Sequence, residues 1–245
     1  MRPWIPQWAT EGSELSEEPA RLARRRLAVS VMVPLGFIVM LWCTYLWGLW
    51  GNEGFYWLGI YPRSLRGVAG IFLSPLIHTS VHHAFSNSVP LLILGSALGY
   101  FYPRAAGRVW VYGWLGSGVG VWLIGRPEYH VGASGIVYML AAFIFVSGML
   151  GQKRGLAALS LLVVFLYGSL VWGVLPMAPE VSWEAHLCGA VAGVALGVVL
   201  RPAKQTTITG YGSASTYDYS SQTHSGAPGW RMVYRSAPAS PNRRD

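Results

Sequence analysis

Residues 132–138 of the chain read Gly-Ala-Ser-Gly-Ile-Val-Tyr and open an apolar run that continues to Leu150. Ser134 therefore falls at the expected N-terminal end of a membrane helix. Unpaired N–H groups and the positive end of the helix dipole favour developing negative charge there. Tyr138 follows four residues later, so on a helix it shares a face with Ser134. Small residues around a serine are also typical of closely packed membrane helices. Taken alone, this stretch favours a helix-packing motif over a nucleophilic serine. The histidines elsewhere in the chain reverse that preference.

The composition of the chain is that of a polytopic membrane protein. Of its 245 residues, 53% are hydrophobic and only 11% are charged, whereas about a quarter of the residues of a soluble domain are charged. The net charge of +8 would also suit a nucleic-acid-binding protein. However, the basic residues stand at the ends of apolar runs and form no patch with interleaved aromatic residues. We therefore expect the lipid bilayer, and no nucleic acid, as a partner.

The apolar runs predict an all-α membrane protein with a bundle of six transmembrane helices. A polar and basic tail is expected at residues 1–26, mobile or interfacial over its first 20 residues, and a disordered tail rich in Ser, Gly, Thr, Tyr and Pro at 201–245. Residues 50–82 mix aromatic residues with Gly, Pro and Arg, which predicts an amphipathic loop partly embedded in the membrane interface. The expected spans within the 27–200 core are 27–49, 83–101, 109–124, 133–150, 156–174 and 185–200.

The distribution of basic residues predicts the orientation of these spans. Most Lys and Arg residues fall in the segments that lie inside if both termini are cytoplasmic, as the positive-inside rule requires. This orientation puts the Ser134 end of the fourth span at the external side of the membrane.

His186 begins an apolar run in which Gly189, Gly193 and Gly197 recur every four residues. These glycines form a smooth helix face that allows another helix to approach closely, and His186 points along roughly the same face. If this face meets the helix that starts at Ser134, the imidazole reaches the serine hydroxyl as a general base. The structural alternative is a histidine bonded to a backbone carbonyl at a helix end.

An acidic third partner is missing from the expected spans. Glu184 stands two residues before His186 and outside the run, so on a helix it faces away from the imidazole. We therefore expect a Ser–His dyad rather than a triad. Tyr138 either orients the imidazole by packing against it or is only a core aromatic residue.

A second polar cluster contains His78, His82, His83 and Asn87. His83 and Asn87 share a helix face and, with the Ser134 backbone N–H, are suited to stabilise an oxyanion. His78 is expected to brace the preceding loop, and His82 to have no role. A metal site is disfavoured because neither a carboxylate ligand nor an HExxH pattern accompanies the histidines.

Two cysteines, Cys43 and Cys188, lie inside apolar runs. We expect both to be small buried side chains, neither a disulfide nor a metal pair. The sequence thus predicts neither a metal nor any other cofactor.

Taken together, these motifs resemble those of the rhomboid family of intramembrane serine proteases, in its compact six-span bacterial form. The match consists of three motifs in the family's order, over roughly residues 27–200. They are Gly132-Ala133-Ser134-Gly135 with Tyr138, then His78, His83 and Asn87, and finally Ala185-His186 followed by Gly189 and Gly193. The 50–82 loop, with Tyr61-Pro62-Arg63, also looks like the family's first loop.

The resemblance implies a serine endopeptidase that cleaves transmembrane protein substrates near the external membrane face. It implies Ser134 as the nucleophile, His186 as the general base, and His83, Asn87 and the Ser134 backbone as oxyanion stabilisers. Tyr138, Gly132 and His78 support them, and a multi-pass location in a bacterial plasma membrane is expected. One alternative is a non-catalytic rhomboid-like protein that binds membrane clients, although such proteins usually lack the serine or the histidine. A small transporter or channel is the other.

Overall fold

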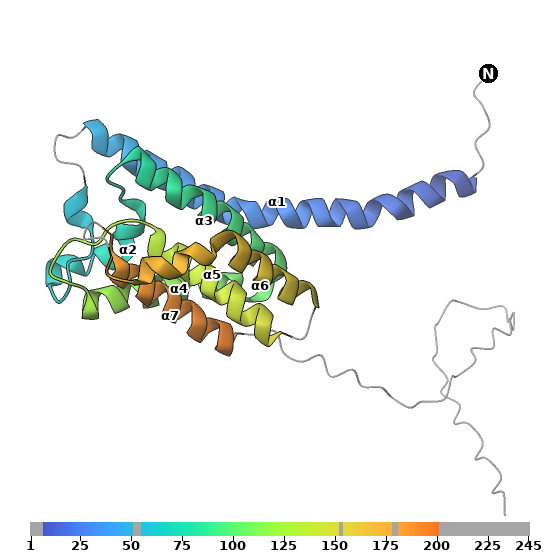
Figure 1. Cartoon of the computed structure of the whole chain (residues 1–245). Coiled ribbons are helices and arrows are strands. Elements are labelled where there is room, and N and C mark those ends of the chain that lie inside the picture. The colour runs from blue at the N-terminus through green and yellow to red at the C-terminus, as the bar shows by residue number, and fades with distance from the viewer. Residues whose placement is uncertain (1–6, 51–54, 152–153, 178–180, 201–245) are drawn as a thin grey trace, which may run out of the picture. The chain divides into compact units, whose positions relative to one another are not determined.

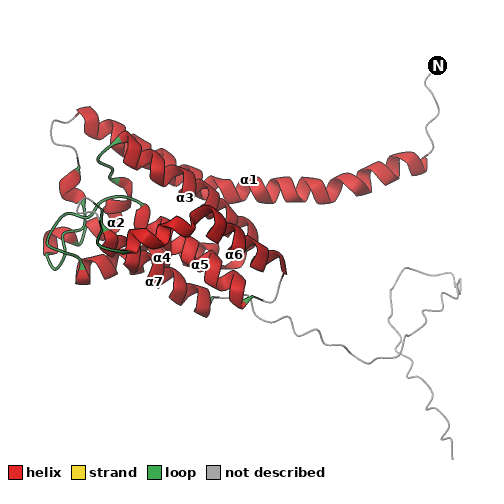
Figure 2. Ribbon diagram, in the orientation of Figure 1, coloured by secondary structure: helices red, strands yellow, loops and turns green. Residues whose placement is uncertain are grey.

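The computed structural model describes residues 7–50, 55–151, 154–177 and 181–200. The expected C-terminal tail, residues 201–245, lies outside the described residues. All regular structure in the described part of the chain is helical (Figures 1 and 2). The helices are α1 (Gln7–Trp50), α2 (Gly70–Leu73), α3 (Val81–Phe101), α4 (Pro103–Ile124), α5 (Ser134–Leu150), α6 (Arg154–Tyr167) and α7 (Trp183–Val199).

Two boundaries differ from the sequence prediction. Helix α1 begins at Gln7, so residues 7–20, expected to be a mobile or interfacial tail, are helical. The Gln, Ala, Glu and Leu residues among them favour this conformation. Helix α6 ends at Tyr167, and the rest of the expected fifth span, Gly168–Val174, is a 3-10 helix. The other expected spans each correspond to one helix within a few residues.

By length and composition alone, two stretches within the described helices could cross a bilayer. They are Ala20–Trp50 and Val81–Phe101. Helices α5 and α7 are apolar but have only 17 residues each. At 1.5 Å per residue each is about 25 Å long, against about 30 Å for the hydrocarbon core of a bilayer. The number of six spans therefore stays a prediction.

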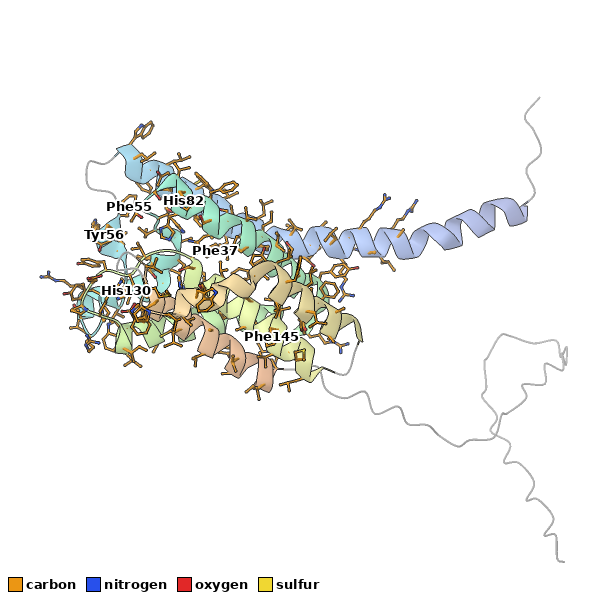
Figure 3. All side chains as sticks on the ribbon, in the orientation of Figure 1. Phe37, Phe55, Tyr56, His82, His130 and Phe145 are labelled. Atoms are coloured by element: carbon orange, nitrogen blue, oxygen red, sulfur yellow. The ribbon has the colours of Figure 1, made fainter. Side chains whose placement is uncertain are left out.

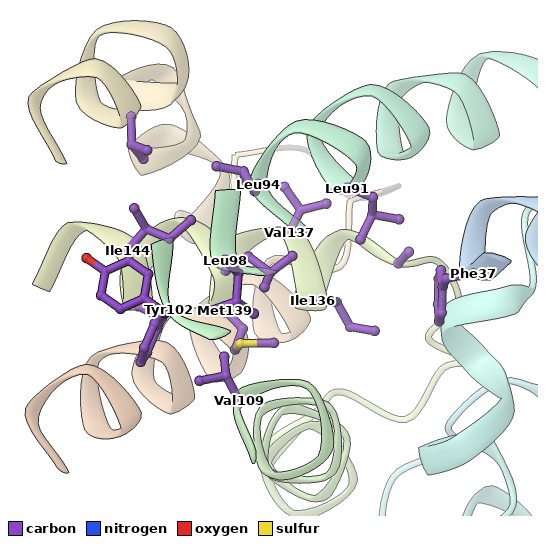
Figure 4. Packing of buried hydrophobic residues seen from close by; sticks show 14 of the residues in the cluster. Phe37, Leu91, Leu94, Leu98, Tyr102, Val109, Ile136, Val137, Met139 and Ile144 are labelled. Atoms are coloured by element: carbon purple, nitrogen blue, oxygen red, sulfur yellow. The ribbon is translucent and has the colours of Figure 1, made fainter. Parts of the chain in front are cut away.

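Helix α5 lies at the centre of the bundle. It contacts α3, α4, α6 and α7 and is apolar on all sides, as a helix buried by neighbours should be. Its fully buried side chains pack with Leu91, Leu94 and Leu98 of α3 and Val109 of α4 (Figure 4). Those α5 residues are Ile136, Met139, Leu140, Phe143 and Ile144.

The four-residue spacing of glycines predicted a close contact with another helix, and the helix that packs against this face of α7 is α5. A side chain at Gly189 would overlap the carbonyl oxygen of Gly135, and one at Gly193 would overlap that of Met139. A Cβ at Gly197 would lie 3.0 Å from the Cβ of Val146. The two helices therefore approach backbone to backbone, with their N-terminal ends, which begin at Ser134 and Trp183, close together.

Over residues 55–80, the loop before α3 contains short helical turns and no uninterrupted span, as the sequence predicted for this stretch. It is fastened to α4 by indole hydrogen bonds, from Trp114 to the carbonyl of Ile71 and from Trp122 to that of Ser64, both at 3.0 Å. The Arg63 guanidinium donates to the carbonyl of Gly125, just past the end of α4, at 2.9 Å. Cations and donors are favourable at such a helix terminus.

The two cysteines have different surroundings. Cys188 is buried, but Cys43 is exposed on α1, so the expectation that both are buried was wrong for Cys43. Helix α1 packs mainly along α3, which leaves its other face uncovered by protein even though that face is apolar. No group of three or more candidate metal ligands occurs among the described residues.

Candidate active site

A cavity of about 800 Å³ lies where the N-terminal ends of α3, α5 and α7 meet the loops. Ser134, Tyr138, His186, His83 and Asn87 all line it. His82, His130 and Tyr56 line it as well and lie at the loop end of the bundle in Figure 3. Residues that are distant in the sequence therefore face one space.

Ser134 is the first residue of α5 and is half-buried. Its backbone N–H belongs to the first turn, where helix geometry provides no intrahelical acceptor. The Ser134 hydroxyl and the positive end of α5 therefore face the same cavity.

The imidazole of His186 is held on two sides. Its ring stacks on that of Tyr138, with centroids 4.1 Å apart and planes 7° from parallel. Its Nδ1 lies 2.8 Å from the carbonyl oxygen of Gly173. Because a carbonyl only accepts, Nδ1 carries the proton in the neutral ring, which leaves Nε2 as the basic nitrogen.

Ser134 and His186 share the cavity, but no hydrogen bond joins the serine hydroxyl to the imidazole. The structure therefore stops short of the direct contact that the sequence predicted. Catalytic hydrogen bonds are often long without substrate and tighten only in the complex. The stacking and the tautomer of the His186 imidazole are already in place.

His78, His83 and Asn87 form one polar group. The amide nitrogen of Asn87 lies 3.0 Å from Nε2 of His78, and the backbone N–H of Ala133 donates to the same nitrogen at 3.4 Å. The rings of His78 and His83 meet edge to face at 4.7 Å. His78 thus connects the loop before α3, α3 itself and the start of α5, as expected of a brace. It uses one of the two amide hydrogens of Asn87 and leaves the other for the cavity.

Gly132 allows the His83 ring to approach the residues before α5. Its φ of +109° lies in the region that favours glycine. A Cβ at this position would lie 2.6 Å from Nε2 of His83 and 3.7 Å from the Asn87 amide nitrogen. A larger residue would therefore displace the His83 ring, whereas the Asn87 amide is at an ordinary contact distance. His82, expected to have no role, is exposed at the cavity rim.

Three residues beside this site were not among the predicted site residues. Gly173 lies in the 3-10 helix after α6, and a side chain there would overlap the Tyr138 hydroxyl. His130 is buried and bonded to Ser182. Glu184 was expected outside the last span, but it lies in the first turn of α7 and is only 1% exposed. A histidine four residues before Ser134 was a visible signal; nothing distinguished Gly173 from other glycines.

The comparison with known protein families identifies the class of this fold and site. The sequence model of the Rhomboid domain matches residues 65–203, more than half of the chain. The chain therefore belongs to the Rhomboid family, which consists of integral membrane proteins and in general of intramembrane serine proteases.

Similar proteins occur in mycobacteria. Uncharacterized proteins of Mycobacterium bovis and Mycobacterium tuberculosis are each 37% identical to this chain over 156 residues, which cover 58% of this chain and 63% of theirs. An uncharacterized protein of Mycobacterium leprae is 34% identical over 152 residues, 56% of this chain and 58% of that protein. The matched part of this chain thus spans less than two thirds of these relatives.

Proposed function

We propose that this chain is an intramembrane serine endopeptidase in which Ser134 is the nucleophile and His186 the general base. The observation that carries the proposal is the common cavity of Ser134, His186, His83 and Asn87, with Nε2 of His186 as its basic nitrogen. The cavity is polar at this point although the helices around it are apolar. Polar residues in such surroundings are costly and mark functional sites.

The reaction is a two-step acyl transfer. Ser134 Oγ attacks the carbonyl carbon of a substrate peptide bond while its proton passes to Nε2 of His186. Collapse of the tetrahedral intermediate breaks the C–N bond, and the leaving amine takes the proton from His186. A water molecule then attacks the acyl-enzyme, gives a proton to His186, and releases the acid as Ser134 recovers its hydrogen.

Negative charge on the substrate oxygen is stabilised by the His83 ring, the free amide hydrogen of Asn87 and the Ser134 backbone N–H. One such donor contributes about 2.7–4 kcal/mol to the transition state. The carbonyl of Gly173 holds the tautomer of His186, the part that a carboxylate plays in a triad. Tyr138 limits rotation of the imidazole by stacking. No metal or cofactor takes part in these steps.

The substrates are transmembrane proteins cleaved near the external end of their membrane segment. A helical segment hides its peptide bonds, so it must unwind locally, and residues of low helix propensity near the cut lower that cost. We further propose six spans, formed by α1 and α3–α7, with both termini in the cytoplasm of a bacterium. The excess of Lys and Arg in the inside segments supports this orientation.

A fluorophosphonate probe tests the assignment, together with cleavage of a model transmembrane substrate by the full chain in detergent. The wild type should be labelled on Ser134 and should cleave. Ser134→Ala and His186→Ala should do neither, whereas Ser86→Ala, which removes another hydroxyl lining the cavity, should behave as the wild type. Labelling that persists in Ser134→Ala would disprove the nucleophile. A folded wild type that binds the substrate without cutting it would favour the client-binding alternative.

A further inference from the structure

A group of polar contacts joins the loop before α5 to the start of α7, outside the residues assigned to the reaction. Nδ1 of His130 lies 2.6 Å from the hydroxyl of Ser182, and its Nε2 lies 3.0 Å from the carbonyl oxygen of Arg126. Because that carbonyl only accepts, Nε2 carries the proton in the neutral ring, and Ser182 donates to Nδ1. His130 lines the cavity but is only 4% exposed, so most of its ring is covered by protein.

A buried carboxylate makes the second connection. Oε1 of Glu184 accepts from the backbone N–H of Arg126 at 3.3 Å and lies 3.7 Å from Nε of its guanidinium. The guanidinium also donates to the carbonyl of Val181 at 3.0 Å. Glu184 sits in the first turn of α7, where the helix dipole favours a negative charge. A buried charge is retained only when it is paired and hydrogen-bonded, so Glu184 needs this loop beside it.

The use of Ser182 shows that these contacts join two segments instead of capping a helix. Ser182 stands at the N-cap of α7, where a serine side chain usually accepts from the backbone of the first turn. Here it makes no such bond, and its hydroxyl bonds to His130 instead.

The contacts stand directly before both reacting side chains. His130 precedes Ser134 by four residues, and Ser182 precedes His186 by the same number. Just beyond the pair, Gly135 and Gly189 bring α5 and α7 into backbone contact. The Ser134–His186 pair is therefore held from one side by the polar contacts and from the other by the glycines.

We propose that Arg126, His130, Ser182 and Glu184 form a positioning clamp that sets the separation of Ser134 and His186, and so the rate of acyl transfer. The clamp rests on the proposed function, because it acts through the two residues assigned there. Arg126, His130 and Ser182 also line the cavity, but the clamp acts through the Ser134–His186 pair and not through contact with the substrate. Loss of the clamp should therefore slow the chemical step while substrate affinity stays unchanged.

The test compares Ser182→Ala and Glu184→Gln with the wild type in detergent. In both variants, the rate of fluorophosphonate labelling and the rate of substrate cleavage should each fall about 10-fold or more. The reason is that a displacement of about 1 Å between reacting groups can lower a rate about 100-fold. Their KM should stay within about twofold of the wild type, because only positioning is lost. Ser182→Thr keeps the hydroxyl and should restore the rate.

Trp122→Phe is the matched control. It removes a hydrogen bond between α4 and the 55–80 loop and should leave the labelling rate unchanged. Wild-type rates in both Ser182→Ala and Glu184→Gln would overturn the clamp and leave the proposed function intact. If Glu184→Gln does not fold, Ser182→Ala, which loses a single oxygen atom, decides alone. A wild type that neither labels nor cleaves would refute the proposed function and the clamp with it.

Discussion

Substitution of Gly189 by alanine should separate the proposed nucleophile from its base. Gly189 lies three residues after His186, and a Cβ there overlaps the carbonyl oxygen of Gly135, the residue after Ser134. The obstacle is backbone inside the central helix, so it cannot rotate away as a flexible side chain would. Relief of the overlap requires α5 and α7 to move apart by roughly 1 Å.

The expected effect on activity is larger than that on stability. Alanine is better than glycine in a helix by about 0.8–1 kcal/mol, while overpacking a close contact costs about 1–3 kcal/mol. Net destabilisation should therefore be between about 0 and 2 kcal/mol. A displacement of about 1 Å between reacting groups can lower the rate about 100-fold, equivalent to about 2.7 kcal/mol of transition-state stabilisation.

The assay measures kcat for a model transmembrane substrate and the rate of fluorophosphonate labelling, together with thermal unfolding in the same detergent. Gly107→Ala in α4 is the matched control, because no heavy atom lies within 4 Å of a Cβ at that position. It should retain the wild-type rate. A Gly189→Ala protein with wild-type kcat would refute the link between the glycine face and the geometry of the pair.

Three further predictions concern the residues around His83. Asn87→Ala should lower kcat by about 100- to 1000-fold with little change in KM, because one oxyanion donor is lost; a change in KM alone would contradict this role. Gly132→Ala should also reduce kcat, since the new side chain needs a φ of +109° and meets the His83 ring; an unchanged rate would contradict it. Burial, with the nearby His83 as a second cause, lowers the pKa of His78 from 6.5 to about 3. The unfolded chain therefore takes up this proton first, and stability should fall as the pH drops from 6.5 towards 3. Unfolding titrations should show a weaker pH dependence in His78→Gln and an unchanged one in His82→Gln, whose side chain is exposed; equal curves for His78→Gln and wild type would contradict the assignment.

The sequence was sufficient for the helices and for the candidate residues. Apolar runs predict helices because backbone polar groups within a membrane must be hydrogen-bonded inside the segment. Four of the six expected runs each match one helix to within a few residues. Exceptions occur where the pattern is weakest. The polar start of α1 is helical without an apolar run to predict it, and the end of the expected fifth span is a 3-10 helix that supplies the Gly173 carbonyl. Nothing in the sequence around Gly173 indicates that its carbonyl bonds to His186, 13 residues later.

Spacing along one helix predicted which side chains share a face, but not which faces meet. The four-residue repeat of glycines predicted a close helix contact, and Ser134, His83 and Asn87 stood out as polar residues in apolar runs. The separation of Ser134 and His186, the tautomer of the imidazole and the contact of the buried Glu184 with Arg126 depend on contacts between distant segments. Periodicity is a local property of a chain, whereas these contacts arise only when α5 and α7 pack together, so tertiary structure alone decided them.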